Sequence, residues 1–333
     1  MKKSLTHNNP MEVEMSMLRR CFLAVCTVAI LAGGMLFGLS PAQAQQKVAI
    51  VLPGSITDQA FNQALYEGVQ LIEKELGLEI AYSEKVKQAD QAEHLEDYAR
   101  RGFGLVLGAG GEFVESTKRA AKRYPDTLFA CLNCALIDNV ATVNFDNVSV
   151  GYLLGFTAGK MSTTGKIGLI SGQDILAARK IVEGLEKGLK AATGGGEVLV
   201  TFTNDWDDVA KAKEAAFGQI SQGADAIVPY LDNGIVGVMQ GLKEKGKWGL
   251  GVLSDMGNSW PDTNLISVNT SWAKSILFLA QAYVDGTAER KDYLFGIGSV
   301  ALNPGTMNSI IPAATISEID MLVDDLRSGK LKP

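Results

Sequence analysis

KVAIVLPGSITDQAFNQALYEG, residues Lys47–Gly68, is the stretch that decides the fold. Lys47–Leu52 is rich in Val and Ile and is followed by Pro53-Gly54, which predicts a buried strand and then a turn. Asp58 comes just before the helical periodicity of residues 59–76, in the position where a carboxylate caps a helix N-terminus. A strand, a loop and a helix in this order place the loop at the carboxyl end of a parallel sheet, where open α/β proteins bind ligands.

Phe61 and Asn62 fall in the first turn of this expected helix. From there they could offer a ring face and an amide to a ligand bound beyond the strand end. The pattern also has a structural explanation, in which Asp58 only caps the helix and Phe61 only packs against the sheet, as in any first strand-and-helix unit. The stretch alone favours this structural explanation.

The same strand-and-helix unit recurs outward from this stretch to the end of the chain, and the pattern restarts at Lys166. Strands that alternate with amphipathic helices over this length predict parallel sheets with helices on both faces, here in two similar lobes. No low-complexity linker separates the two halves, so we expect a hinge of several short crossings rather than one flexible tether. The last strand is predicted at Phe295–Ala301, before a final helix at Thr315–Ser328.

The first 44 residues have the pattern of a secretory signal peptide. Arg19-Arg20 precede an apolar run, Cys21–Leu39, and Ala42-Gln43-Ala44 supplies small residues at the spacing of a cleavage site. The apolar run is near the lower length limit of a membrane anchor, which is the alternative, but the cleavage motif directly after it favours removal. We therefore expect cleavage after Ala44 and a periplasmic protein.

Composition limits the class of protein further. The chain has 333 residues, 47% of them hydrophobic and 20% charged, which is enough for two globular domains. Its net charge is −6, and loss of four basic and two acidic residues with the leader changes this to −8. An acidic chain without a basic block argues against nucleic acid as a partner.

The chain after the leader lacks the residues of common catalytic centres. It has a single histidine, His94, and two cysteines, Cys131 and Cys134, which provide neither a zinc ligand set nor a histidine-based triad. The two cysteines lie in the strand-like run Thr127–Ile137 instead of opening a helix, so we expect buried thiols or a small structural bridge. Residues 108–111 are glycine-rich but lack the third glycine of a dinucleotide site. We expect no cofactor, no metal and no catalytic residue.

Acidic and aromatic residues gather instead at the ends of predicted strands. Paired carboxylates could serve hydrolysis, as in a glycosidase, whereas ring faces beside acids suit recognition of a planar or polyhydroxylated ligand. Export, two lobes and the lack of a reactive nucleophile favour binding, with an extracytoplasmic hydrolase or a ligand-sensing signalling receptor as alternatives. The candidate ligand-binding residues are Asp58, Phe61, Asn62, Glu112, Trp206, Asp232, Asp255 and Trp272.

Several ordered motifs together resemble the basic membrane protein (Bmp) family, which comprises substrate-binding proteins of ABC transporters and includes purine nucleoside receptors. The resemblance covers nearly all of the chain after the leader. The motifs are ITDQAFNQALYEG (56–68), GGEF (110–113), YPDTLFA (124–130), YLLGFTAGKMS (152–162), WDDVAKAKEAA (206–216), QGADAIVPYLDNG (222–234), GVLSDM (251–256) and ISVNTSWAKSI (266–276).

The resemblance implies a type I periplasmic-binding-protein fold, with two Rossmann-like lobes that clamp a ligand between them. In the nucleoside-binding members, aromatic residues at the positions of Phe61 and Trp206 sandwich the base. An asparagine at the position of Asn62 contacts the base, and an aspartate at that of Asp255 helps to hold the ribose. The resemblance therefore implies these roles for the four residues.

This chain departs from the nucleoside receptors at three positions. Leu52 stands where they have a ribose-binding aspartate, Trp272 lies where a lysine is expected, and Glu112 is the only acid near their base-contacting aspartate. Glu112 and Asp232 could instead cap the helices that follow them, and Trp272 could pack the hinge. The departures argue against a plain purine nucleoside as the ligand.

We therefore expect a non-enzymatic, monomeric binding protein that closes around a small polar, heterocyclic ligand by a hinge motion and delivers it to an ABC permease in the inner membrane. The amino-terminal lobe is predicted to comprise residues 45–162 with about 269–293. The carboxy-terminal lobe is predicted to comprise residues 163–268 with about 294–333.

Overall fold

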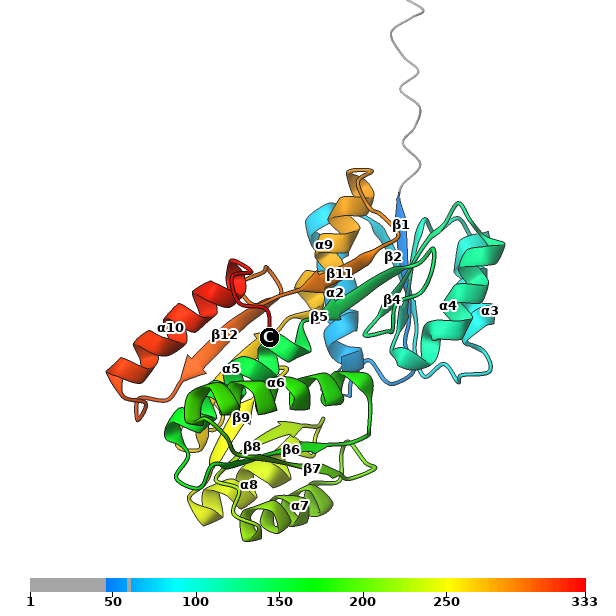
Figure 1. Ribbon diagram of the computed structural model, residues 1–333. Coiled ribbons are helices and arrows are strands. Elements are labelled where there is room, and N and C mark those ends of the chain that lie inside the picture. Colours follow the sequence, from blue (N-terminus) through cyan, green and yellow to red (C-terminus); the bar gives the residue numbers. More distant parts are fainter. Residues whose placement is uncertain (1–45, 59–60) are drawn as a thin grey trace, which may run out of the picture. The chain divides into compact units, whose positions relative to one another are not determined.

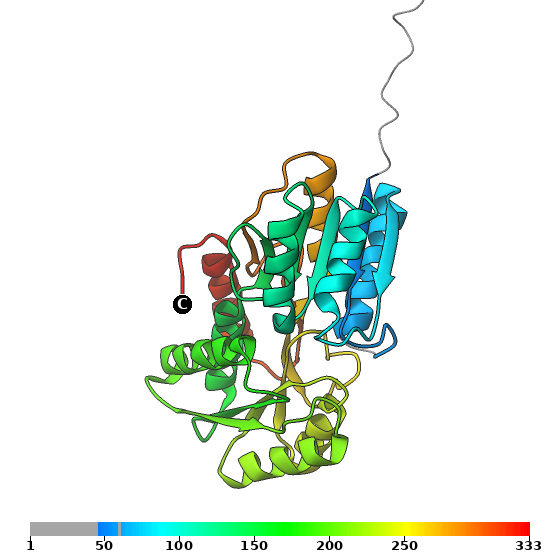
Figure 2. The ribbon, with the colours of Figure 1, turned by 90° about the vertical axis from the view of Figure 1, so that its right-hand side faces the viewer.

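The computed structural model describes residues 46–58 and 61–333, which form two six-stranded sheets (Figures 1 and 2). The predicted signal peptide, its cleavage site after Ala44 and the first two positions of the predicted helix at 59–76 lie outside the described residues. Within the described part of the chain, no helix has both the length and the apolar character needed to cross a membrane.

The first sheet is entirely parallel, with the order β11-β5-β4-β3-β1-β2. Helices α2 and α9 pack together on one face, and α3 and α4 on the other (Figure 1). The strands are β1 (Lys47–Val51), β2 (Glu79–Ser83), β3 (Leu105–Ala109), β4 (Leu128–Leu132), β5 (Ala141–Phe145) and β11 (Asp292–Phe295). The helices are α2 (Phe61–Leu76), α3 (Gln91–Arg100), the short 3₁₀ helix η1 (Gly111–Phe113), α4 (Val114–Arg123) and α9 (Trp272–Val284).

The second sheet has the order β12-β10-β9-β8-β6-β7, and every neighbouring pair in it is parallel except β10 and β12. Helix α5 packs with α6 and α10, and α7 packs with α8. The strands are β6 (Lys166–Ser171), β7 (Glu197–Phe202), β8 (Ala226–Tyr230), β9 (Trp248–Gly251), β10 (Asn264–Thr270) and β12 (Leu302–Met307). The helices are α5 (Asn147–Met161), α6 (Leu176–Thr193), α7 (Val209–Ser221), α8 (Ile235–Lys245) and α10 (Ala313–Arg327).

The predicted strand Phe295–Ala301 is wrong. The structure has one strand that ends at Phe295 and another that begins at Leu302, and the two belong to different sheets. β11 pairs with β5, and β12 pairs antiparallel with β10. Gly298 has φ = 88°, a backbone conformation that breaks a strand. The sequence of β12, LNPGTM, does not look like a strand, but its Pro304 is tolerated because β12 is an edge strand.

Helix α5, which the sequence analysis groups with the amino-terminal lobe, packs against α6, α10, β6 and β10. Glycines bring α5 and α6 unusually close: a Cβ atom on Gly151 would collide with the carbonyl oxygen of Ile181, and one on Gly184 with that of Val148. This close approach fixes α5 to the second sheet's helices, and the chain therefore leaves the first sheet at the end of β5.

Three segments connect the two sheets: Asp146 after β5, Ser271 after β10, and residues 296–301 between β11 and β12. Hydrogen bonds tie these crossings together, because the Asp146 N–H donates to the carbonyl of Phe295 (3.0 Å) and the Ser271 N–H donates to that of Ala301 (2.8 Å). The fold is therefore the expected two-lobed α/β type with a hinge of several crossings.

Candidate functional site

The strand order places the candidate residues at the ligand-binding position of each sheet. In both sheets the chain runs outward in opposite directions from the first strand, which gives a topological switch point between β1 and β3 and another between β6 and β8. Ligands of open α/β sheets bind beyond the carboxyl ends of the strands at such points. Asp58 and Glu112 follow β1 and β3, and Asp232 follows β8, so three candidates lie at the two switch points.

Asp58 and Asn62 organise the loop between β1 and α2. The Asp58 carboxylate accepts hydrogen bonds from the backbone N–H groups of Asn62 (3.0 Å) and Gln63 (3.0 Å), and from the Asn62 side-chain amide (2.7 Å). The Asn62 carbonyl oxygen accepts from the Gly54 N–H (3.0 Å), and a Cβ on Gly54 would overlap that amide. Asp58 is therefore the cap of α2, as the sequence suggested, while remaining only partly buried.

A neighbouring acid that the sequence analysis did not select also supports this loop. Glu84, directly after β2, accepts hydrogen bonds from the backbone N–H of Ile56 (3.1 Å) and from the hydroxyl of Ser55 (3.4 Å). No local sequence pattern indicates this role, because Glu84 reaches the loop only through the pairing of β1 with β2.

Phe61 is half-buried and packs its ring edge-to-face against Trp272, with 5.2 Å between ring centroids and an interplanar angle of 81°. Trp272 in turn packs against Phe145 at 4.7 Å and 82°. Trp272 is 8% exposed and begins α9 directly after a crossing between the sheets. Its position is thus that of a hinge-packing residue, the alternative that the sequence left open, and it connects the candidate ligand contact Phe61 to the hinge.

Glu112 is exposed in η1, immediately beyond β3. A disulfide links Cys131, in the neighbouring strand β4, to Cys134, just after that strand, and both cysteines are buried. The Gly110 N–H donates to the carbonyl of Leu132 (2.9 Å), so the loop that carries Glu112 rests against the bridged segment. The two cysteines therefore form the small structural bridge that was one of the two expected outcomes.

Trp206 lies in the loop between β7 and α7 and is half-buried. Its indole ring covers Gly172, where a Cβ atom would collide with it, and its centroid is 6.2 Å from that of Tyr230. The Trp206 carbonyl oxygen accepts hydrogen bonds from the N–H groups of Asp232 (3.1 Å) and Gly234 (3.0 Å). These bonds join the Trp206 loop to the loop that follows β8.

Asp232 is the most perturbed carboxyl group of the candidate set. Burial, the negative charge of Asp207 and that of Asp58 together raise its pKa to about 6. Asp58 belongs to the first sheet's loops and Asp232 to those of the second, so this electrostatic interaction joins the two halves of the candidate site. Asp207 was missed as a site residue, although its place in the run NDWDD beside Trp206 could have indicated it.

Asp255, in the loop after β9, is held in place by hydrogen bonds from Gly257 and Thr306. Its carboxylate accepts from the N–H groups of Gly257 (3.0 Å) and Thr306 (3.0 Å) and from the Thr306 hydroxyl (2.8 Å). Burial acts to raise the pKa of Asp255, but these hydrogen bonds outweigh it and hold the pKa below its ordinary value. The residue thereby fastens its loop to β12.

Asp207 accepts a hydrogen bond from the N–H of Asn233, next to Asp232 (3.2 Å), and the negative charges of Asp207 and Asp58 both raise the pKa of Asp232. Trp206 lies in the adjoining loop, and Phe61 packs separately against Trp272. The stacking of a ligand between Phe61 and Trp206, and contacts from Asn62, Glu112 and Asp255 to a ligand, stay predictions. Carboxylates whose negative charges repel one another favour a ligand with N–H or O–H donors, because such donors stabilise the charged forms.

Comparison with known proteins places this geometry in context. The family model Bmp, described as PnrA-like ABC transporter substrate-binding proteins, matches residues 45–319. A purine-binding protein of Brucella abortus is 27% identical over 312 residues, which cover 92% of this chain and 88% of the relative. The transcriptional activator protein med of Bacillus subtilis is 28% identical over 298 residues, 89% of this chain and 92% of that protein.

A solved structure shows a similar fold. An ABC transporter solute-binding protein from Aeropyrum pernix superimposes with a TM-score of 0.74 and 20% sequence identity, covering 86% of this chain and 92% of that one. At this level of identity the similarity establishes the arrangement of the two sheets and says nothing of the ligand.

Proposed function

The chain belongs to the Bmp family of PnrA-like ABC transporter substrate-binding proteins, which are not enzymes, and on this premise we propose that it captures a small polar, heterocyclic ligand between its two lobes. The ligand is nucleoside-like or purine-like and carries hydrogen-bond donors. The protein is exported, acts as a monomer and delivers the ligand to an ABC permease in the inner membrane.

The interaction between Asp58 and Asp232 carries this proposal. Each acid lies beyond a strand of a different sheet, and burial, followed by repulsion from Asp207 and Asp58, disfavours the ionised form of Asp232. A ligand that donates hydrogen bonds to both carboxylates removes that repulsion only when it is in contact with both lobes. Closure around the ligand is then favoured, because the gain exists only in the closed arrangement.

Aromatic rings support a flat ligand. Phe61 and Trp206 are both partly exposed, and they lie close in the chain to Asp58 and Asp207. Rings in such positions contribute by stacking on a heterocycle and by burying its faces. The Brucella relative is a purine-binding protein, which favours the same class of ligand here.

One position argues for a base or a modified nucleoside instead of a plain nucleoside. Leu52, directly after β1, is completely buried, and its side chain offers no acceptor for a ribose hydroxyl. The proposed specificity therefore rests on the heterocycle and its amino or hydroxyl substituents.

The decisive experiment is mass spectrometry of the small molecules that co-purify with the exported protein, followed by calorimetry with each compound found and with a panel of purines and nucleosides. The Asp232→Asn variant, purified in parallel, is the matched control, and it should carry much less of the same compound. Recovery of an intact heterocycle supports the proposal. A ligand without a ring or without donors, or a compound converted to product by the pure protein, contradicts it.

A further inference from the structure

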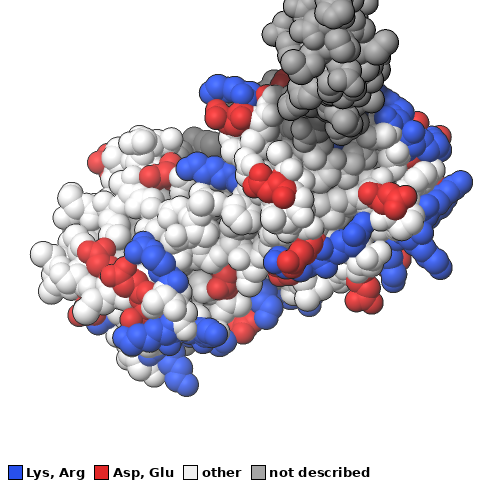
Figure 3. All heavy atoms as spheres, turned by 90° about the horizontal axis from the view of Figure 1, so that it is seen from above, with Lys and Arg blue, Asp and Glu red and all other residues white. Residues whose placement is uncertain are grey.

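Helix α4 presents a cationic face on an acidic protein. Its ten residues include four cations and one acid, all exposed, whereas the whole chain has a net charge of −6. The side that packs inward consists of small residues, so the long charged side chains all lie on the outward side. Figure 3 shows Lys and Arg side chains, with acids among them, along the side of the molecule where α3 and α4 lie. The face is formed by Glu115, Lys118, Arg119, Lys122 and Arg123.

Two of the cations are held in place by one buried acid of α3. Arg119 Nε lies 3.3 Å from Glu96 Oε1, and Arg123 Nη1 lies 2.7 Å from Glu96 Oε2. The Glu96 side chain is 4% exposed, whereas those of Arg119 and Arg123 are 69% and 61% exposed. A single buried carboxylate thus orients two guanidinium groups but neutralises only one of them, and the outward surface stays positive.

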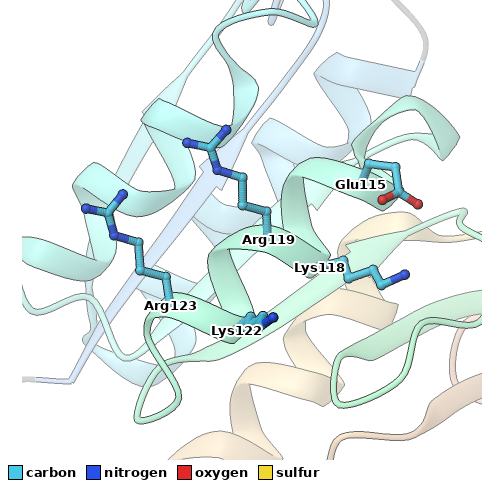
Figure 4. A pocket seen from close by; sticks show the side chains of 5 residues that line it. All are labelled: Glu115, Lys118, Arg119, Lys122 and Arg123. Atoms are coloured by element: carbon cyan, nitrogen blue, oxygen red, sulfur yellow. The ribbon is translucent and has the colours of Figure 1, made fainter.

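Lys118 and Lys122 are the other two cations, and no ion pair of either is found among residues 46–58 and 61–333. They are four residues apart, which places them on the same side of the helix. Figure 4 shows that the two lysines and the two arginines point to different sides of α4. The four side chains line a shallow surface depression of about 550 Å³.

This divergence determines what the face can bind. A pocket for one phosphate or carboxylate needs donors that converge on a point, and these four cations spread apart along a helix. Cations spread over an exposed face suit an extended anionic surface, where each charge finds its own partner. None of the exposed large apolar side chains of the described residues lies on α4, so the face has nothing to insert into a hydrocarbon layer.

Helix α6 provides a useful contrast, because three of its cations form ion pairs with neighbouring acids. Arg179 pairs with Asp174 (2.6 Å), while Lys180 (2.7 Å) and Lys187 (2.9 Å) both pair with Glu183. All of these side chains are exposed by more than a third. Lys180 and Lys187 therefore form a matched control for Lys118 and Lys122.

We propose that the cationic face of α4 docks the protein on the anionic surface of a lipid bilayer. The remainder of the chain is acidic and is repelled by such a surface, so approach through α4 fixes the orientation of the whole protein. The association is peripheral, reversible and sensitive to salt, since it rests on charge alone. It goes beyond ligand capture, because a bilayer-bound protein stays close to any membrane partner whether or not its ligand site is filled.

The test is co-sedimentation of the exported protein with vesicles of phosphatidylcholine alone or with about one third phosphatidylglycerol. Binding should require the anionic lipid and should weaken strongly when salt shortens the Debye length from roughly 30 Å to about 10 Å. The double variant Lys118→Gln/Lys122→Gln should lower the partition coefficient about fivefold for each charge removed. The control Lys180→Gln/Lys187→Gln removes the same number of charges and should leave it within about twofold.

Thermal unfolding of both double variants should match the parent protein, since all four lysines are on the surface. Equal losses of binding in the two variants, or no preference of the parent for anionic vesicles, overturns the proposal. A third result also overturns it: loss of binding to the purified permease in detergent, without any effect on vesicles, would make the partner an acidic protein surface. Binding of the small-molecule ligand is measured separately, so failure here leaves the ligand-capture proposal unaffected.

Discussion

The negative charge of Asp58 raises the pKa of Asp232, although Asp58 caps α2 after β1 in the first sheet and Asp232 follows β8 in the second. After burial and the charge of Asp207, this interaction is the third cause that raises the pKa of Asp232 to about 6. A repulsive pair that links two lobes is useful in a protein that must close only when ligand is present.

The first prediction concerns pH and the stability of the ligand-free protein. Because the folded-state pKa of Asp232 lies above its ordinary value, protonation of this carboxyl stabilises the folded state. This contribution is complete below about pH 4 and is lost as the pH rises through about 6. Asp232→Asn should therefore increase the free energy of unfolding by about 1–3 kcal/mol near neutral pH and have little effect near pH 4. Denaturant titrations at the two pH values decide it, and an equal effect at both would show that the charge is not responsible.

Protonation of Asp232 should have the opposite effect on ligand affinity: it stabilises the ligand-free protein but weakens binding. Protonation of Asp232 removes an acceptor, so binding should weaken as the pH falls from about 7 to about 5. Calorimetry across this range should show the dependence in the parent protein and a flat profile in Asp232→Asn. A parent profile that is also flat would remove Asp232 from the site.

For Phe61 and Trp206, the size of the loss in ligand affinity can be predicted. Phe61→Ala and Trp206→Ala should each weaken ligand binding about tenfold to a hundredfold, because each lost ring removes roughly 1–3 kcal/mol of stacking. The double variant should show a non-additive loss, since both rings act on one ligand. Phe278→Leu, which alters an exposed ring on α9, is the control and should bind normally. If Phe61→Ala lowers only the melting temperature and Trp206→Ala changes nothing, the rings have purely structural roles.

The role of Asp255 can be tested by comparing variants of Asp255 and of Thr306, its hydrogen-bond partner. Asp255→Asn and Thr306→Val should both lower the free energy of unfolding by about 1–3 kcal/mol, because each disrupts the bonds between the β9 loop and β12. The pKa of Asp255 lies below its ordinary value in the folded protein. The stabilisation is therefore fully present at a pH above the ordinary pKa of an aspartate and is lost as the pH falls through the lowered pKa. If Asp255 also contacts ligand, only Asp255→Asn should reduce affinity in calorimetry. Equal losses in both variants would assign the residue to loop stability alone.

The disulfide should matter for stability more than for binding. Replacing both Cys131 and Cys134 with Ser opens a very short loop, so we expect a loss of about 2 kcal/mol or less in the free energy of unfolding. Ligand affinity should change little, because the bridge supports the η1 loop without carrying any of the acids of the site. Denaturation with and without a reducing agent measures the first effect, and calorimetry the second. A large drop in affinity with the fold intact would mean that the bridge positions Glu112.

Much of the local structure could be predicted because periodicity reports burial directly. The strand expected at Lys47–Leu52 is found at Lys47–Val51, and the helix expected to end at residue 76 does end at Leu76, since their apolar patterns are strong. β12 was missed because Pro304 and Gly305 give it the composition of a turn, and only its antiparallel pairing with β10 makes it a strand. The same lack of long-range information led to the wrong strand at Phe295–Ala301.

The sequence by itself determined the two-lobed α/β class, the family and the residue types at the strand ends, because each of these depends on segments of the chain taken one at a time. Only the tertiary structure decided that Trp272 packs against Phe61 and Phe145 at the hinge, and that Asp58 interacts with Asp232. These partners are far apart along the chain, and no local pattern encodes which strand ends will meet. Their proximity follows from the repeated crossing of the chain between two sheets, which is a property of the whole fold.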